Sequence, residues 1–258
     1  MRGFAAVAAL AAALPVWAEV PPPADVVILG EVHDNPTHHA WQAEVVAAMA
    51  PSALVFEMLL PEQAALAGPE RDDAAALAAA LEWDGRGWPD YDLYSPILAA
   101  APDALIVGGD VPHDDVRRAM EAGAAAVFGP EAARYGLTDA LAPDDQAARE
   151  AEMDAAHCHA LPAEMLPGMV EAQRLRDATL ARAAIEAHAV SGGPVAVIAG
   201  TGHARRDRGV PAALSAAAPG LSVYSVGQFE VDPGPDAPFD RVIVTEPTPR
   251  DDPCAAFR

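Results

Sequence analysis

Lysine is absent from this sequence, in which all 16 basic residues among the 258 are arginines. The chain therefore has no P-loop lysine, no Schiff-base lysine and no serine–lysine dyad, which excludes P-loop phosphoryl transfer and pyridoxal-phosphate chemistry. Positive charge is also scarce overall, because 38 acidic residues leave a formal net charge of −22. Non-specific binding to nucleic acid is therefore not expected.

Cysteine is nearly as rare, with only Cys158 and Cys254. Two cysteines are too few for a disulfide framework or a four-thiolate zinc site, and the missing Cys-x-x-Cys-His motif excludes covalent attachment of a c-type haem. The two thiols can pair in an oxidising compartment. They can equally stay free if their Cα atoms lie more than about 7 Å apart.

Long apolar runs are missing except near the start of the chain. Arg2, an apolar run over 4–14 and the small or apolar residues of 16–18 together predict a secretory signal peptide over residues 1–18. The run is too short to span a bilayer. No cysteine follows it to accept a lipid, so we expect a mature chain that begins at Glu19 in the periplasm or outside the cell. The alternative is a buried N-terminal helix of a cytoplasmic protein.

Short apolar runs alternate with helical stretches along the rest of the chain. Strands are expected at 25–29, 53–56, 104–107, 195–199, 221–226 and 241–245, the last of them at an edge because it alternates more. Helices are expected at 35–49, 72–81, 114–125, 143–156 and 162–188. This order predicts an α/β fold with a mostly parallel central sheet and helices on both faces.

Two stretches depart from the alternation. Residues 83–94 hold four tryptophans and tyrosines among glycines and prolines without a clear period, which predicts an irregular excursion. Residues 114–188 lack strong strands, which predicts a helical subdomain inserted between strands of the sheet. We expect residues 19–258 to form a single domain around this insertion.

Chemically capable side chains follow four of the expected strands. Glu31 and His33 come after the first, Glu57 after the second, Asp110 after the third and His203 after the strand at 195–199. The carboxyl ends of parallel strands share one edge of a sheet, and ligands of such folds bind there. We therefore expect these side chains to converge, although each one alone has an ordinary interpretation as a helix cap or loop residue.

The expected crevice has two possible chemistries. Glu31, His33, Glu57 and His203 offer a mixed nitrogen and oxygen ligand set for Zn, Mn, Fe or Co, which Asp34 and His113 can complete or orient. A metal there would support hydrolysis by activating a bound water. Alternatively, the same side chains form a buried hydrogen-bonded network that shapes a pocket without a metal.

The motifs around these residues resemble those of a known family. Gly30 to His33 and Gly200 to His203 are two Gly-x-x-His segments, and with Glu57 they resemble a superfamily that includes erythromycin esterase, the Tiki metalloproteases and the TraB proteins. Within that superfamily the sequence is similar to the ChaN family over about residues 25–230. The segments that carry the similarity are LGEVHDN at 29–35, FEM at 56–58, WPDYDLYSP at 88–96, HCHALP at 157–162, AQRLRD at 172–177 and GTGHARRDRGVP at 200–211.

The resemblance implies a haem-binding protein of an iron or haem uptake system, which holds two face-to-face haems at a homodimer interface with tyrosine ligation and histidine contacts. It implies Tyr94, ahead of Tyr91, as the phenolate ligand, with His157 or His159 approaching from a second subunit. The candidates for binding the propionates are Arg174, Arg176, Arg205 and Arg206.

Other interpretations stay open on the sequence alone. The tryptophans and tyrosines of 83–94 can instead plug a loop against the core, and Arg174, Arg176 and Asp177 can form a solvated helical face. His157-Cys158-His159 offers metal ligands, but three consecutive residues cannot all point one way on a regular element. The alternative functions are a metal-dependent hydrolase of esters or peptides that uses Glu31, His33, Glu57 and His203, and an interaction domain with a vestigial crevice.

Overall fold

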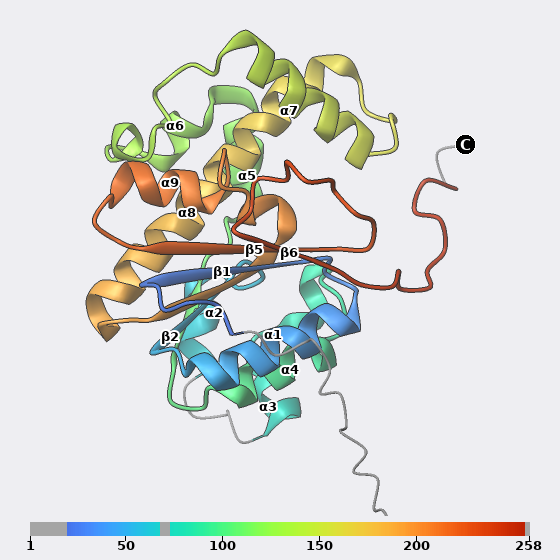
Figure 1. Cartoon of the computed structure of the whole chain (residues 1–258). Helices are drawn as coiled ribbons and strands as arrows, with labels where there is room; N and C mark the ends of the chain where they lie inside the picture. The colour runs from blue at the N-terminus through green and yellow to red at the C-terminus, as the bar shows by residue number, and fades with distance from the viewer. Residues whose placement is uncertain (1–19, 68–72, 256–258) are drawn as a thin grey trace, which may run out of the picture.

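Six parallel strands form a sheet at the centre of the molecule (Figure 1). The structure is a computed structural model that describes residues 20–67 and 73–255, so the signal peptide expected at 1–18 lies outside the described residues. The strands are β1 (Val26–Glu31), β2 (Ala53–Phe56), β3 (Leu105–Gly108), β4 (Val195–Gly200), β5 (Val223–Phe229) and β6 (Arg241–Val244), in the order β3-β2-β4-β1-β5-β6. The predicted α/β fold is confirmed, and β6 lies at an edge as expected.

The strand order places β4 between the first two strands of the chain. β1 pairs with β4 on one side and β5 on the other, while β2 pairs with β4 and β3. All six residues of β1 and of β4 are buried, and apart from Glu31 at the end of β1 both strands are free of polar side chains, as expected for central strands covered on both faces. Their register pairs Glu31 with Gly200, which brings the ends of the two strands level at one edge.

Helices cover both faces of the sheet. In Figure 1, α1 (Pro36–Met49), α3 (Ala74–Ala80) and α4 (Tyr91–Ala100) lie below it, and in the chain α2 (Pro61–Ala64) follows β2. Above the sheet lie α5 (His113–Ala122), α6 (Ala124–Phe128), α7 (Pro143–Ala156), α8 (Leu166–Ser191) and α9 (Val210–Ala217). Each layer buries its own apolar cluster against the sheet, with Trp41 and Tyr94 in the lower one and Leu175 and Leu180 in the upper one.

Local sequence accounts for the helix boundaries near the site. Asn35 caps α1 because its side chain accepts hydrogen bonds from the amides of Thr37 and His38, and Pro36 takes the first helical position. α1 ends at Ala50, which adopts a left-handed conformation with φ 46°. These signals place the helix directly behind the loop that follows β1.

The structure differs from the expected elements in three places. The excursion predicted at 83–94 is irregular only in part, because α4 begins at Tyr91, capped by Asp90, and continues through Pro96. The helix expected at 114–125 breaks at Gly123, whose φ of 87° ends α5 before α6 begins. The helix at 210–217 was not expected. Between β3 and β4 the chain is helical from α5 to α8.

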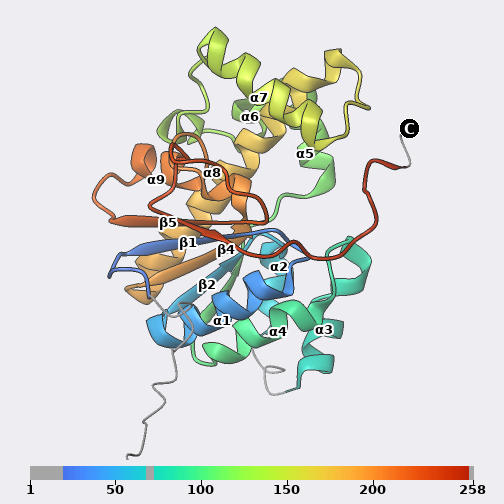
Figure 2. The ribbon, with the colours of Figure 1, turned by 45° about the vertical axis from the view of Figure 1, so that its right-hand side comes forward.

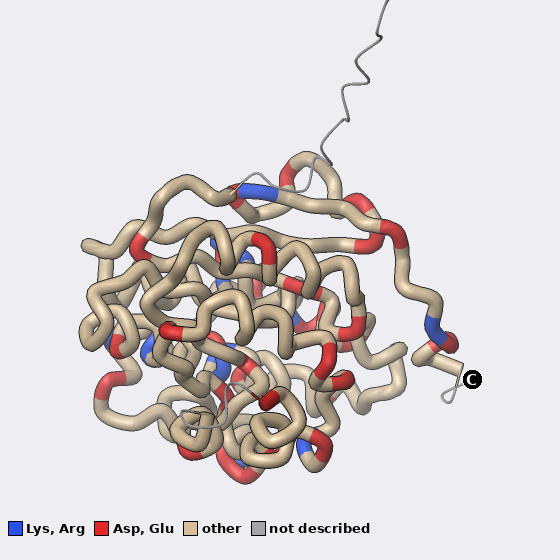
Figure 3. Tube along the Cα trace, turned by 90° about the horizontal axis from the view of Figure 1, so that it is seen from below, with Lys and Arg blue, Asp and Glu red and all other residues tan. Residues whose placement is uncertain are grey.

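No helix in the described part of the chain is long and apolar enough to cross a membrane. Acidic residues are spread over the whole trace, with few arginines among them (Figure 3). Cys158 and Cys254 form a disulfide, with their Cα atoms 5.4 Å apart.

Candidate functional site

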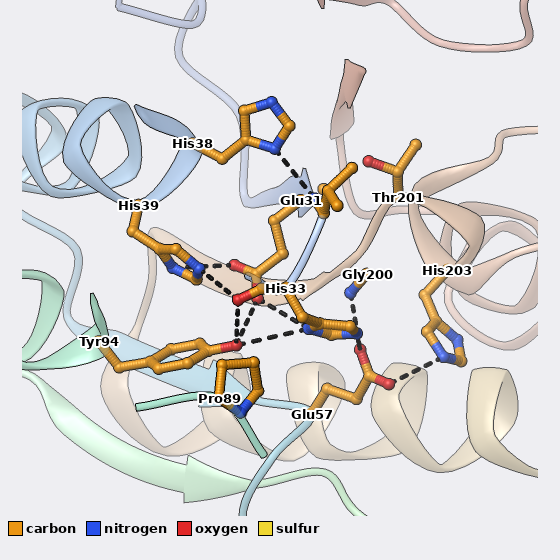
Figure 4. A network of polar contacts seen from close by, with 12 residues as sticks. Glu31, His33, His38, His39, Glu57, Pro89, Tyr94, Gly200, Thr201 and His203 are labelled. Atoms are coloured by element: carbon orange, nitrogen blue, oxygen red, sulfur yellow. Dashed lines mark hydrogen bonds and ion pairs between the residues drawn. The ribbon is translucent and has the colours of Figure 1, made fainter. Parts of the chain in front are cut away.

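The end of β1 places Glu31 and His33 together. β1 stays extended through Glu31, and the chain then turns, with the Asn35 amide donating to the carbonyl of Val32 at 2.9 Å. The Nδ1 of His33 lies 2.9 Å from the Glu31 carboxylate, which accepts from it (Figure 4). Glu31 is buried, whereas the His33 side chain is 31% exposed. The loop after β1 therefore presents one imidazole outward, fixed from behind by a buried carboxylate.

The ends of β2 and β4 bring a second carboxylate and imidazole to the same edge. Glu57 Oε1 lies 3.2 Å from His203 Nε2, and Glu57 Oε2 lies 3.7 Å from His33 Nε2. The Gly200 amide also donates to Glu57 Oε2 at 2.6 Å. The four side chains that were expected to converge, Glu31, His33, Glu57 and His203, therefore form one contiguous cluster.

Two further residues extend this cluster in opposite directions. Asp177, from the middle of α8, accepts from His203 Nδ1 at 2.6 Å. Tyr94, from α4, donates its hydroxyl to Glu31 Oε1 at 2.8 Å (Figure 4). Acid and imidazole groups thus alternate from Asp177 through His203, Glu57 and His33 to Glu31. We call these five residues the acid–imidazole chain.

Burial and mutual contact shift the pKa values of the acid–imidazole chain. Burial alone would lower the pKa of His203, but the carboxylates of Glu57 and Asp177 outweigh it and raise the pKa to about 10. Burial disfavours the ionised form of Glu57, yet His203 and His33 hold its pKa well below the usual range. At neutral pH, Glu57 and His203 are therefore a buried ion pair.

The pKa values of His33, at the outward end of the acid–imidazole chain, and of the neighbouring Tyr94 are also shifted. Burial opposes protonation of His33, but Glu31 and Glu57 raise its pKa above the ordinary value. Burial, reinforced by Glu31, raises the pKa of Tyr94 far above that of free tyrosine. Tyr94 is thus a neutral hydrogen-bond donor, held edge-on to His39 with ring centroids 4.4 Å apart.

A cavity of about 540 Å³ opens beside the acid–imidazole chain. The carboxyl ends of β1, β2 and β4 form one wall, and α7 and α8 form the other. Met153, Ala156 and Val170 give the second wall an apolar part. The volume lies in the range of small-molecule sites in proteins.

Arginines line this cavity in an otherwise acidic protein. Arg149, Arg176, Arg205 and Arg208 reach it. Arg149 pairs with Asp145, Arg205 with Asp207, and Arg208 with Glu152. Arg176 differs, because it makes no ion pair within 4 Å to any residue of the described ranges, and its buried Nε has no hydrogen-bond partner there.

The structure separates the predicted cofactor-binding residues into two groups. His157, Arg176 and Arg205 line the cavity. The others lie elsewhere: Tyr94 and Tyr91 are buried in the lower core, Arg174 binds Glu171 and the carbonyls of residues 136, 137 and 139, Arg206 pairs with Asp240, and His159 is exposed beside Asp154.

The expected supporting residues also lie apart from the cavity. Asp34 is bound by Arg250, Asp110 pairs with Arg86, and His113 begins α5. Among residues 20–67 and 73–255, no group of three or more His, Cys, Asp or Glu side chains is arranged to hold a metal ion. Glu31, His33, Glu57 and His203 meet as hydrogen-bonded and ionic pairs.

Sequence reasoning did not assign three residues of the cluster. Asp177 and Gln173 sit on the face of α8 that meets His203, with the Gln173 amide nitrogen 3.0 Å from Nδ1. His39 Nδ1 lies 3.5 Å from Glu31 Oε2. The sequence did contain a signal for Asp177. This acid lies among Leu175, Ala178, Leu180 and Ala181, and a carboxylate on an apolar helix face needs a buried partner.

Comparison with known proteins shows the family and the fold of the chain. A sequence profile described as haem-binding uptake, Tiki superfamily, ChaN matches residues 17–214. The chain belongs to the ChaN family of haem-binding uptake proteins. This confirms the resemblance carried by the Gly-x-x-His segments and Glu57. No curated protein sequence matches the chain significantly.

A solved structure of a ChaN protein shares the fold. The chain is similar to a structure titled for cofacial heme binding to ChaN of Campylobacter jejuni, at 19% identity and a TM-score of 0.62, over 80% of this chain and 81% of that one. It also matches the type III effector HopBA1 at 17% identity and a TM-score of 0.46, over 87% and 88% of the two chains.

Proposed function

We propose that this chain is a secreted haem-binding protein of an iron or haem uptake system, and that it binds haem in the cavity beside the acid–imidazole chain as a homodimer. The observation that carries the proposal is that cavity, lined by imidazoles and by the unpaired Arg176, in a member of the ChaN family. Family membership supports haem as the ligand, and we propose the cavity as the place where it binds.

The residues of the cavity fit a haem. A porphyrin needs an apolar surface, an axial donor for its iron and cations for its propionates. Met153, Ala156 and Val170 offer the apolar surface, and Arg176 has a buried Nε without a partner. When bound, haem supplies an iron with axial positions open to a protein ligand.

An imidazole is the axial donor that this geometry favours. His157 lines the cavity at the end of α7, and His33 reaches it from the loop after β1. Tyr94, in contrast, is fully buried, with its hydroxyl committed to Glu31 and its pKa raised by burial. A phenolate ligand at Tyr94 would require α4 to move. We therefore propose His157 as the donor, with Arg176 and Arg205 holding propionates.

A homodimer and an oxidising compartment complete the proposal. A flat apolar group held at the mouth of a cavity exposes one face, which a second copy of the chain can cover. A Campylobacter jejuni relative is titled for cofacial heme binding. The Cys158–Cys254 disulfide supports a location outside the cytoplasm, where such bonds persist.

A hemin titration of residues 19–258 tests this function. We expect a Soret band that saturates at one haem per chain, together with a doubling of mass in analytical ultracentrifugation. Absence of saturable absorbance at micromolar hemin would overturn haem binding, and saturation of a monomer would overturn the dimer.

Hydrolysis is a second candidate, favoured by the acid–imidazole chain itself. His33 is an outward-facing imidazole backed by Glu31 and Glu57, which is an arrangement suited to general acid–base chemistry. A metal-dependent form would require Glu31, His33, Glu57 and His203 to exchange their hydrogen-bonded and ionic pairs for bonds to the ion, because in the described residues they are not arranged as a metal site. Metal analysis and turnover of an ester panel, before and after chelation, test it. Turnover lost in both His33→Ala and His203→Ala would support hydrolysis, whereas absence of turnover in the wild type would exclude it for that panel.

A further inference from the structure

The turn between α7 and α8 is held by a covalent link to a distant segment. It contains His157, Cys158 and His159, and Cys158 is bonded to Cys254, 96 residues further along the chain. Cys158 and His159 both adopt left-handed conformations, with φ of 60° and 55°. Two successive non-glycine residues in this region are unfavourable, so the turn depends on restraint from elsewhere in the molecule.

The segment that supplies Cys254 follows β6, and we call residues 245–255 the C-terminal tail. It runs from the end of β6 toward the top of the molecule in both ribbon views (Figures 1 and 2). Arg250 fixes its middle, because two of its nitrogens donate to the Asp34 carboxylate at 2.8 Å and it also binds Glu230 at 2.7 Å. The tail is thus attached to the loop after β1 through Asp34, to the end of β5 through Glu230 and to the turn between α7 and α8 through Cys158.

Two of these attachment points are next in sequence to an imidazole of the cavity. Asp34 follows His33, and Cys158 follows His157. The C-terminal tail therefore links the two sides of the cavity mouth, from the loop after β1 to the end of α7. Because the tail is attached beside both histidines, it restrains the distance between His33 and His157, which a ligand in the cavity would contact.

α7 itself contributes little to holding that distance. None of its residues, 143–156, is fully buried. Its contacts toward the sheet side include ion pairs of Glu152 with Arg208 and Arg205. Such partly exposed pairs contribute little to stability. The Cys158–Cys254 bond is therefore a covalent restraint on an end of α7 whose side chains are otherwise only partly buried.

We propose that the Cys158–Cys254 disulfide makes ligand binding redox-dependent, because the oxidised C-terminal tail holds His157 at the cavity and its reduction releases that histidine. The inference rests on the proposed haem-binding function. The reductant is a dithiol: one thiolate attacks a sulfur of the disulfide to form a mixed disulfide, and the second thiolate displaces it. Two electrons pass to the protein, Cys158 and Cys254 each take a proton, and the dithiol becomes a disulfide.

Hemin titration of the chain in both redox states tests the proposal. We expect wild type reduced by dithiothreitol, and the double variant Cys158→Ser/Cys254→Ser, to bind hemin about tenfold more weakly than oxidised wild type. The double variant is the control for effects of dithiothreitol on hemin, and its affinity should not change with reductant. Equal affinity of oxidised wild type and double variant would overturn the proposal.

A double-mutant cycle separates a positioning role from a merely structural one. His157→Ala should weaken binding about tenfold in the oxidised chain but less than twofold in the Cys158→Ser/Cys254→Ser background, because the histidine is already released there. His188→Ala, which removes an imidazole bound to Asp25 instead, is the matched control and should leave affinity unchanged. Additive losses at His157 and the disulfide would overturn the proposal.

A measurement without haem checks the mechanism directly. Amide hydrogen exchange over 153–166 should become at least tenfold faster on reduction, while β1 and β4 keep their protection. Unchanged exchange in this turn would overturn the proposal even if affinity fell. If oxidised wild type binds no hemin at all, the proposed function fails as well, whereas equal binding by every variant removes only the redox dependence.

Discussion

Charged residues of the site are of two kinds, those paired inside the protein and one cation at the cavity wall. Glu57 and His203 form an ion pair inside the protein, where removing one partner leaves the other charge buried. Arg176 is the reverse case, since its guanidinium stands at the cavity wall without a counter-ion within 4 Å in the described residues. The first pair maintains the fold, whereas the guanidinium of Arg176, whose printed electrostatic partner among the described residues is Asp110, is available to a ligand.

The raised pKa of His203 predicts a dependence of stability on pH. Its folded-state pKa of about 10 exceeds the unfolded value of 6.5, so its contribution is complete below pH 6.5 and is lost as pH rises through 10. Between pH 8 and pH 10, the free energy of unfolding of wild type should fall by about 2 kcal/mol more than that of His203→Gln. Urea unfolding measures this, and parallel curves for the two proteins would contradict it.

Arg176 should matter to binding more than to folding. Arg176→Ala removes a cation that makes no ion pair within 4 Å in the described residues, so we expect hemin affinity to fall about tenfold. Its guanidinium does attract the Asp110 carboxylate at longer range, so the free energy of unfolding should fall by no more than about 1 kcal/mol. Soret titration and urea unfolding give the two quantities. Arg117→Ala, at an exposed arginine of α5, is the matched control. A loss of stability without loss of affinity would assign Arg176 to the fold.

Among the elements, β1 has little room for an added side-chain atom near the site. Gly30 lies one residue before Glu31, where β1 is enclosed by β4 and β5. A Cβ at this position would lie 2.8 Å from the carbonyl oxygen of Val226 and 2.9 Å from the Cα of Thr201. The glycine is thus required by close backbone approach on both sides of the strand.

Gly30→Ala should therefore lower the free energy of unfolding by about 2 kcal/mol, because the new methyl group forces backbone atoms of neighbouring elements apart. Gly220→Ala is the control, since a Cβ there meets nothing within 4 Å. Thermal unfolding of the two variants measures the effect. Equal melting temperatures would show that β1 can shift without cost.

The elements that the sequence predicted are those with a simple apolar period. The runs at 26–31, 53–56 and 195–200 are buried on both faces, so their composition alone indicates central strands. α4 was missed because Tyr91, Tyr94 and Pro96 mask the helical period, and only the packing of its aromatic face against the lower core fixes it as a helix. In α4, burial in the tertiary structure therefore outweighs the low local helix propensity.

The convergence of the site residues at the strand ends was predictable from the sequence. The side chains that helices contribute to the site were not. Glu31, Glu57 and His203 follow strands of one parallel sheet, and topology alone brings strand ends together. The partners Asp177 and Tyr94 come from helices, whose rotation about their axes sets which side chain faces the sheet. That rotation depends on packing, which a single sequence does not display.

For the whole molecule, the disulfide joins the helical layer to the segment after β6. It closes a loop across a sequence separation of 96 residues. In the chain-entropy account, a link of this length raises the free energy of the unfolded chain by about 5 kcal/mol, because it removes conformational entropy from it. The fold therefore has a covalent restraint between its upper layer and the edge of its sheet.

Reduction should therefore lower the free energy of unfolding of the whole protein by about 3 kcal/mol. Urea denaturation with and without dithiothreitol measures the change. The variant Cys158→Ser/Cys254→Ser should show the lower value in both buffers. Identical midpoints for oxidised and reduced wild type would mean that the link restrains only the turn.

The position of β4 has a consequence for the order in which the protein acquires its site. β1 and β2 are not neighbours, and the strand that fits between them comes more than 130 residues after β2, beyond the whole helical stretch. Until β4 inserts, the two halves of the sheet present open edges, and Glu57 has neither the Gly200 amide nor His203. Such long-range pairing is slow and exposes a folding chain to aggregation. The ion pair at the centre of the site therefore forms with the step that completes the sheet, and a ligand that requires this site binds only chains that have finished folding.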